Sequence, residues 1–151
     1  MKVQQISLFM ENKPGRLVGP CRALAEAGIN ILTLSLADTK QFGILRLIVR
    51  DWQRARALLE REGYVANISE VIVLEAIDRA GGLTDILVEF ESERINLEYL
   101  YAFTLQRGRR AVMVLRCDNP DAAIAAIARA KVPVLSNEEI LRALEGDTPG
   151  A

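Results

Sequence analysis

The segment from Glu11 to Leu17 has the residue types and order that suit the binding of a small anion. Pro14 and Gly15 form a turn between an alternating apolar stretch and a helical pattern, so free backbone N–H groups of the first helical turn point outward. Glycine allows a ligand to come close to the backbone, and a helix N-terminus favours negative charge. The carboxylate of a free amino acid fits such a place. A tight strand-to-helix connection without a ligand explains the same residues.

Two asparagines flank the helix that we expect after this turn. Asn12 lies just before the turn and Asn30 just after the helix. Their amide oxygens would accept hydrogen bonds from the ammonium of an amino acid. Asn30 is equally explained as a turn residue before a strand.

The residues that most enzymes use for catalysis are scarce. The chain has no histidine, which removes the commonest general base, the Ser-His and Cys-His nucleophile pairs and the most frequent metal ligand. Cys21 and Cys117 form no CxxC pair, so we expect two small hydrophobic side chains rather than a disulfide or zinc site. Carboxylate and lysine catalysis stay open. We nevertheless expect a protein that is not an enzyme and has no metal or cofactor.

The charge and the hydropathy pattern limit the partners. Lys and Arg number 19 and Asp and Glu 20, so the net charge of −1 provides no field that would attract nucleic acid or an anionic membrane. No apolar run approaches the roughly 20 residues that span a bilayer. The first residues alternate like a strand and contain no signal-peptide core. We therefore expect a cytoplasmic protein that binds neither nucleic acid nor membrane.

The sequence repeats at a nearly constant spacing. Pro14-Gly15-Arg16-Leu17 is echoed by Ala80-Gly81-Gly82-Leu83, and Ile29-Asn30-Ile31 by Ile95-Asn96-Leu97, both 66 positions later. Asp51-Trp52 is matched by Asn119-Pro120 at a spacing of 68. The two additional residues fit a longer hairpin around Gly108. The repetition predicts two modules of the same fold.

Each half has the element order strand, helix, strand, strand, helix, strand. In the first half we expect helices after Leu17 and after the N-cap Asp51, and strands at 3–10, 31–37, 44–49 and from Tyr64. In the second half we expect helices around Leu83 and from Asn119, a short closing helix at 136–139, and strands at 71–77, 97–104, 111–117 and 132–135.

These patterns predict an α+β fold of two ferredoxin-like βαββαβ modules, with antiparallel sheets and both helices on one face. Residues 1–70 would form the first module, 71–145 the second and 146–151 a flexible tail.

The first expected helix has an apolar stripe and an unusual proline. Leu17, Cys21, Leu24 and Ala25 form an apolar stripe at helical spacing, which predicts the buried face of this helix. The corresponding helix of the second half has a matching stripe of Leu83, Ile86, Leu87 and Phe90. Pro20 lacks a backbone donor, so we expect an extended turn over 14–19 and a regular helix that begins near Pro20. A tolerated kink is the alternative.

The pattern Asn12-x-Pro14-Gly15-x-Leu17, followed by Ala27-Gly28-Ile29-Asn30-Ile31, resembles the signature of ACT domains. These are ferredoxin-like regulatory modules of amino-acid biosynthetic enzymes, and the resemblance extends over both halves. In the serine-binding ACT module of phosphoglycerate dehydrogenase, the strand-turn-helix junction and the asparagine after the helix contact the ligand. The resemblance therefore implies this role for Asn12, Gly15 and Asn30. Met10 stands where that family has a histidine, a departure that concerns serine specificity rather than amino-acid binding.

Turn chemistry and resemblance together predict ligand-binding residues in both halves. They are Asn12, Pro14, Gly15, Arg16, Leu17 and Asn30 in the first half, and Asp78, Gly81, Gly82, Leu83 and Asn96 in the second. Asp78 replaces Asn12, and its carboxylate would attract an ammonium but repel a carboxylate. We therefore expect the two halves to bind differently, with the first as the better site.

Three other features have two readings each. Tyr99, Tyr101 and Phe103 share one strand face, which predicts packing between sheets or modules, with RNA base stacking as the weaker alternative. The hairpin arginines Arg107, Arg109 and Arg110 form a solvated turn or a docking point for an acidic partner. Arg46 needs a carboxylate partner if it faces the core, and a ligand would supply one.

We expect a non-catalytic regulatory protein that senses an amino acid at the junction, at an interface between modules or between the copies of a homodimer or higher oligomer. The alternative is a protein–protein interaction module that binds no small molecule and regulates a partner enzyme. A ferredoxin-like acylphosphatase would need an arginine-bearing phosphate cradle, and no matching Gly-rich motif is visible.

Overall fold

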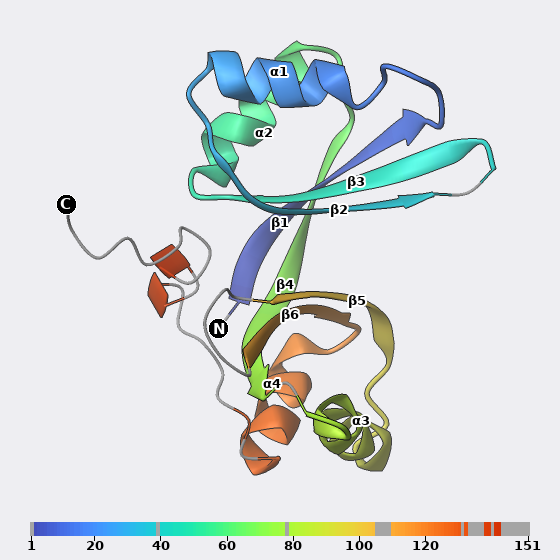
Figure 1. Cartoon of the computed structure of the whole chain (residues 1–151), viewed down its shortest axis with the longest axis vertical. Coiled ribbons are helices and arrows are strands. Elements are labelled where there is room, and N and C mark those ends of the chain that lie inside the picture. The colour runs from blue at the N-terminus through green and yellow to red at the C-terminus, as the bar shows by residue number, and fades with distance from the viewer. Residues whose placement is uncertain are drawn as a thin grey trace. The chain divides into compact units, whose positions relative to one another are not determined.

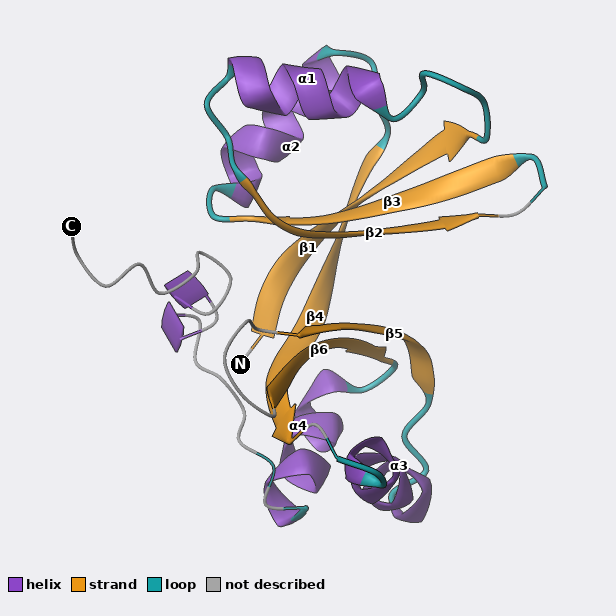
Figure 2. Ribbon diagram, viewed as in Figure 1, coloured by secondary structure: helices purple, strands orange, loops and turns teal. Residues whose placement is uncertain are grey.

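The structure is a computed structural model that describes residues 2–38, 40–77, 79–104, 110–130, 132, 138–139 and 141–142. Its helices and strands alternate in the predicted order (Figures 1 and 2). Along the chain they are β1 (Lys2–Glu11), α1 (Val18–Glu26), β2 (Ile31–Asp38), β3 (Phe42–Val49), α2 (Trp52–Arg61), β4 (Ala66–Ile77), α3 (Gly82–Ser92), β5 (Leu97–Thr104), β6 (Arg110–Cys117) and α4 (Pro120–Arg129).

The chain divides into two compact units: a first unit of Gln4–Ser69, and a second unit of Glu70–Ala151 together with Met1–Val3. In the first unit the hydrogen-bonded strands follow the order β2-β3-β1-β4, and in the second β4-β6-β5. β3 pairs antiparallel with both β1 and β2, and β6 pairs antiparallel with both β4 and β5. The prediction of two ferredoxin-like modules is confirmed. Three expected parts of the second module lie mostly or wholly outside the described residues: the strand at 132–135, the closing helix at 136–139 and the tail at 146–151.

The boundary between the two units falls inside one strand. We expected a strand from Tyr64 and a separate strand from Val71, but β4 runs without interruption from Ala66 to Ile77. The residues between Ala66 and Val71 include no glycine or proline that would break a strand. A single strand therefore belongs to the first unit up to Ser69 and to the second unit from Glu70.

In each unit, two helices pack on one side of the strands around an apolar core. In the first unit α1 and α2 lie together over β1 and β3 (Figure 2). Its buried core consists of Ile6, Leu8, Leu24, Ile29, Leu45, Leu47, Val49, Ala55, Leu59 and Ala66. The core of the second unit consists of Ile72, Leu74, Ile86, Phe90, Ile95, Met113, Leu115, Cys117, Ala123, Ala126 and Ile127. In α2 the buried residues are Ala55 and Leu59, four positions apart on one helical face.

The buried face of α1 differs from the predicted stripe. Pro20 and Leu24 are its buried residues, whereas Leu17 is 37% exposed and Ala25 is exposed. Leu83 and Leu87 in the second unit are likewise more than a third exposed, while Ile86 and Phe90 are buried. α1 is thus rotated about its axis relative to the prediction, and small residues such as Gly19 and Ala23 face α2. Helical periodicity alone does not determine which of two apolar faces is buried.

The late start of α1 is as predicted, but the helix begins two residues before Pro20 and the extended turn is correspondingly shorter. Residues 14–17 form turns, and the regular helix begins at Val18. Pro20 is therefore the third residue of α1, where a backbone N–H has no partner within the helix. At the matching position of α3, Ile86 has the N–H that Pro20 lacks, and α3 extends two residues further toward its own turn. The proline shortens α1 at its start without breaking it.

Glycine ends α1, as is common at helix C-termini. Gly28 has a φ of 68°, its N–H donates to the Ala25 carbonyl at 2.9 Å, and the Ile29 N–H donates to the Leu24 carbonyl at 2.9 Å. These bonds form the Schellman motif. The same motif ends α3, but Arg94 occupies the left-handed position with a φ of 55°.

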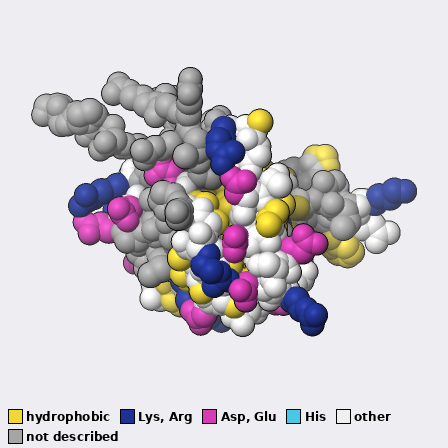
Figure 3. Space-filling model, turned by 90° about the horizontal axis from the view of Figure 1, so that it is seen from below, with side chains coloured by type: hydrophobic (Ala, Val, Ile, Leu, Met, Phe, Trp, Pro, Cys, Tyr) yellow, Lys and Arg dark blue, Asp and Glu magenta, His cyan; other side chains and the backbone are white. Residues whose placement is uncertain are grey.

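The charged side chains are mixed in sign on the surface. On the face drawn in Figure 3, Lys and Arg side chains lie among Asp and Glu side chains. None of the described helices is long and apolar enough to cross a membrane.

Candidate ligand-binding site

The junction between β1 and α1, hereafter the first junction (Glu11–Val18), is a tight turn built around Gly15. The Arg16 N–H donates to the Lys13 carbonyl at 3.3 Å, with Pro14 and Gly15 at the two central positions. Gly15 has a φ of 85°, as the third residue of a type II turn requires. A second turn follows, in which the Val18 N–H donates to the Gly15 carbonyl at 3.2 Å. The predicted Pro-Gly turn is therefore present.

The first junction presents backbone donors to solvent. Among the described residues, the N–H groups of Gly15 and Leu17 donate to no protein acceptor. Every residue from Asn12 to Val18 is exposed. The junction also precedes the N-terminus of α1, where the helix dipole favours negative charge. Its geometry suits a carboxylate that accepts hydrogen bonds from the backbone.

A cluster of three charged side chains surrounds the first junction. The Glu11 carboxylate accepts from Lys13 Nζ at 3.1 Å through one oxygen and from Arg16 Nη2 at 2.5 Å through the other. Hydrogen bonds from Lys13 and then Arg16 hold the pKa of the Glu11 carboxyl below its ordinary value. All three residues belong to the segment that the sequence singled out, but only Arg16 was among the predicted ligand-binding residues. The charges at positions 11, 13 and 16 were the available signal, because the turn brings them to one side.

Asn30 does not lie beside the first junction. It is exposed and follows the C-terminal end of α1, whereas Asn12 and Gly15 precede its N-terminal end. The nine residues of α1 separate the two groups by about 13 Å. Asn30 instead borders a hollow of about 360 Å³, lined by Cys21, Ala25, Gly28, Ile29, Asn30 and Ile31. Within one unit, a single amino acid cannot contact both predicted parts of the site.

The junction between β4 and α3, hereafter the second junction (Arg79–Leu83), repeats the same turn with different charges. The Gly82 N–H donates to the Arg79 carbonyl at 3.1 Å, and Gly81 has a φ of 86°. The guanidinium of Arg79 pairs with Asp85 in the first turn of α3. Asp78 lies outside the described residues.

Asn96 lies at the other end of α3, like Asn30 at the end of α1. Its backbone N–H donates to the Asp118 carboxylate at 3.1 Å, and its carbonyl accepts from the Asp118 N–H at 3.1 Å. In both units the predicted residues therefore form two groups, one at each end of a helix.

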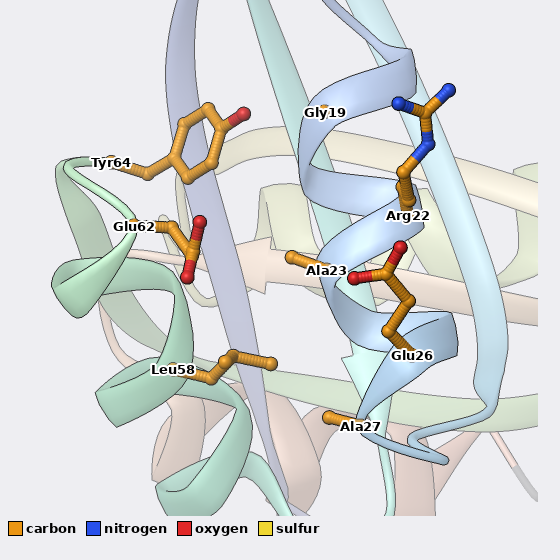
Figure 4. A pocket seen from close by; sticks show the side chains of 8 residues that line it. All are labelled: Gly19, Arg22, Ala23, Glu26, Ala27, Leu58, Glu62 and Tyr64. Carbon is orange, nitrogen blue, oxygen red and sulfur yellow. The ribbon is translucent and has the colours of Figure 1, made fainter.

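A larger hollow of about 440 Å³ lies between α1 and α2 (Figure 4). Figure 4 shows Tyr64 and Glu62 on one wall, facing Gly19 and Ala23 on the other. A Cβ atom built on Gly19 would lie 2.2 Å from the Tyr64 hydroxyl oxygen. The absence of a side chain at Gly19 thus allows Tyr64 to approach α1 closely.

Arg46 on β3 and the aromatic residues of β5 are two further features that the sequence singled out. Arg46 does not face the helix-covered core, because its neighbours Leu45 and Leu47 do, and it pairs across the sheet with Ser7 and Ser35. The β5 aromatics Tyr99, Tyr101 and Phe103 are half-buried and alternate with Leu100, which packs against the core.

The two cysteines form no disulfide bond with each other. Both cysteines are free thiols; Cys117 is buried and Cys21 half-buried. Arg107 and Arg109, and the side chain of Arg110, lie outside the described part of the chain. No group of three or more histidine, cysteine or acidic side chains that could hold a metal ion occurs among the described residues.

The geometry agrees with comparisons to known proteins. Residues 1–144 match the family model of the ACT domain pair. The chain belongs to the ACT domain pair family. Protein BT0572 from Bacteroides thetaiotaomicron is 32% identical to this ACT domain pair, with a TM-score of 0.85 over 94% of this chain and 97% of that chain.

More distant solved structures share the fold of this ACT domain pair. The regulatory subunit of aspartate kinase from Thermus thermophilus is 19% identical, with a TM-score of 0.63 over 84% of this chain and 91% of that chain. The corresponding subunit from Thermus flavus is 18% identical, with a TM-score of 0.60 over 85% and 92%. No curated protein matches the sequence.

Proposed function

We propose that this ACT domain pair is a non-catalytic regulatory protein that senses a free amino acid, with the ligand carboxylate bound at the first junction. The observation that carries the proposal is the pair of N–H groups of Gly15 and Leu17, at the exposed start of α1, that have no acceptor among the described residues. Arg16 and Lys13 add positive charge beside them. A few charge-assisted hydrogen bonds of about 1.5–3 kcal/mol each suffice for the micromolar to millimolar affinity of a metabolite sensor.

The ammonium group of the ligand is bound by an asparagine from another copy of the protein. The carboxylate and the ammonium of an amino acid are attached to the same carbon atom, whereas the first junction and Asn30 lie at opposite ends of α1. A homodimer or higher oligomer brings the junction of one copy to the Asn30 of its partner. Binding then regulates because the ligand prefers one arrangement of copies over another.

Exposed apolar side chains of the first unit support such an assembly. β2 is at the edge of the strand order, and its Leu34 and Leu36 are 48% and 49% exposed. On the other face, Phe9 and Phe42 are 51% and 56% exposed. Edge strands with exposed apolar residues are usual places for association.

The test is a thermal-shift screen of the full chain against the common amino acids at millimolar concentration, with analytical ultracentrifugation at each hit. We expect a rise in melting temperature with one amino acid or a few of similar shape, and a change in the oligomer distribution. Asn30→Ala should remove the response, while Asn67→Ala, an exposed asparagine on β4, should retain it.

The alternative function is a protein–protein interaction module that binds no small molecule and regulates a partner enzyme. The exposed Phe9, Leu34, Leu36 and Phe42 favour it. An absence of any thermal shift across the amino-acid panel would leave this alternative as the better explanation.

A further inference from the structure

The first junction contains a carboxylate of its own. Glu11, at the end of β1, bonds through one oxygen to Lys13 Nζ and through the other to Arg16 Nη2. Both cations are on the turn that presents the Gly15 and Leu17 N–H groups. Glu11 therefore occupies the side chains that would otherwise be available to a carboxylate ligand.

The two junctions differ in their balance of charge. Lys13 and Arg16 exceed Glu11 by one positive charge at the first junction. At the second junction, Arg79 is neutralised by Asp85, and the sequence places Asp78 beside it, which leaves one net negative charge. Each turn thus has an internal carboxylate, on the strand in one case and on the helix in the other. Only the first junction keeps positive charge for an incoming anion.

We propose that Glu11 is an internal competitor for the carboxylate of the ligand and sets the affinity of the first junction for carboxylates. This inference rests on the proposed function, in that it assigns Lys13 and Arg16 to carboxylate recognition at the same site. An incoming carboxylate takes over the bond from Arg16 while the backbone N–H groups of Gly15 and Leu17 bind it from the other side. Glu11 returns to Lys13 or to water.

The exchange is feasible because the internal ion pairs are solvated. The side chains of Glu11, Lys13 and Arg16 are 42%, 64% and 59% exposed. Ion pairs this exposed are weak and are screened by salt. A competitor of this kind lowers the affinity of the site without blocking it. The affinity for a carboxylate is then adjusted by one side chain that need not touch the ligand.

Acetate is the probe, because it has the carboxylate and no other recognition group. The full chain is titrated with sodium acetate at constant ionic strength, and the amide resonances of Gly15, Arg16 and Leu17 are followed by NMR. We expect Glu11→Gln to bind acetate about two- to fivefold more tightly than the unmodified protein, as the loss of an exposed ion pair allows. The matched control is Glu60→Gln, since Glu60 forms a similar exposed pair with Arg56 at 2.8 Å on α2.

The role of Arg16 is tested by a second substitution. In an Arg16→Gln background, Glu11→Gln should have a clearly smaller effect, because the shared cation is gone. An equal effect in both backgrounds would overturn the competition for Arg16. Equal acetate affinity of Glu11→Gln and the unmodified protein would also overturn the inference, as would an absence of binding at the junction in both.

These outcomes are independent of the amino-acid screen. If an amino acid binds but Glu11→Gln changes nothing, the inference fails and the proposed function stands. If acetate responds to Glu11→Gln but no amino acid shifts the melting temperature, the proposed function fails and the competition for carboxylates stands.

Discussion

Replacing Gly19 with alanine should destabilise the first unit, although alanine is the better helix former. Gly19 is the second residue of α1, and its added Cβ would lie 2.2 Å from the Tyr64 hydroxyl oxygen but 3.5 Å from the ring carbon Cζ. The first distance is a severe overlap and the second an ordinary contact. The clash therefore depends on one oxygen atom, which Tyr64→Phe removes.

The magnitudes follow from these two distances. Overpacking of this kind costs about 1–3 kcal/mol, while alanine gains roughly 0.5–1 kcal/mol over glycine within a helix. Gly19→Ala alone should thus lower the free energy of unfolding by up to about 2.5 kcal/mol. In the Tyr64→Phe background the same change should raise it by roughly 0.5–1 kcal/mol. The sign of the effect reverses between the two backgrounds.

Urea unfolding of the four proteins measures this coupling. The single tryptophan, Trp52, starts α2 and packs against the core of the first unit, so its fluorescence reports that unit. Sites that do not interact add to within about 0.3–0.5 kcal/mol. A coupling energy within that range would show that the Tyr64 ring swings away from α1, and would refute the reasoning.

Three further predictions concern single groups. Arg94→Gly should raise the free energy of unfolding by roughly 0.5–1 kcal/mol in calorimetry, because Arg94 has a φ of 55° that glycine adopts more easily; no gain would contradict this. At pH 8, Cys21 should react with a thiol reagent, whereas Cys117 should react only in denaturant, because burial raises the pKa of its thiol to about 11. Similar reaction rates for the two cysteines would contradict the buried position of Cys117. The Glu11 carboxyl should titrate by NMR below its ordinary pKa of about 4.3, so its ion pairs stabilise the fold above that pH and are lost as the pH falls through the folded value. Arg16→Gln should raise that midpoint, and an unchanged midpoint would exclude the ion pair.

Local features of the chain were predictable where backbone chemistry alone determines them. The Pro14-Gly15 turn, the late start of α1 at Val18 and the glycine that ends α1 each depend on a missing donor or a positive φ within a few residues. The duplication was visible because the matching turns of the two halves need the same glycine, and Gly15 and Gly81 indeed have φ values of 85° and 86°.

Features that depend on neighbours distant in sequence were not predictable in the same way. We predicted a buried stripe that includes Leu17 and Ala25, whereas the buried residues of α1 are Pro20 and Leu24. Both sets have helical spacing, so only the packing of α1 against α2 determines which set is buried. The sequence did not predict that β4 is one continuous strand. Whether two adjacent strand-like segments join into one strand depends on their pairing with strands distant in the sequence.

For the candidate site, the sequence by itself determined the chemistry of the first junction: a glycine turn, free N–H groups and an absence of histidine. Only the tertiary structure decided which groups share a place. It brought Leu58 and Tyr64 beside Gly19 and Ala23 of α1, so that residues far apart in the sequence line one hollow. The physical reason is that residue types specify what a group can bind, whereas the path of the chain specifies which groups lie within reach of one ligand.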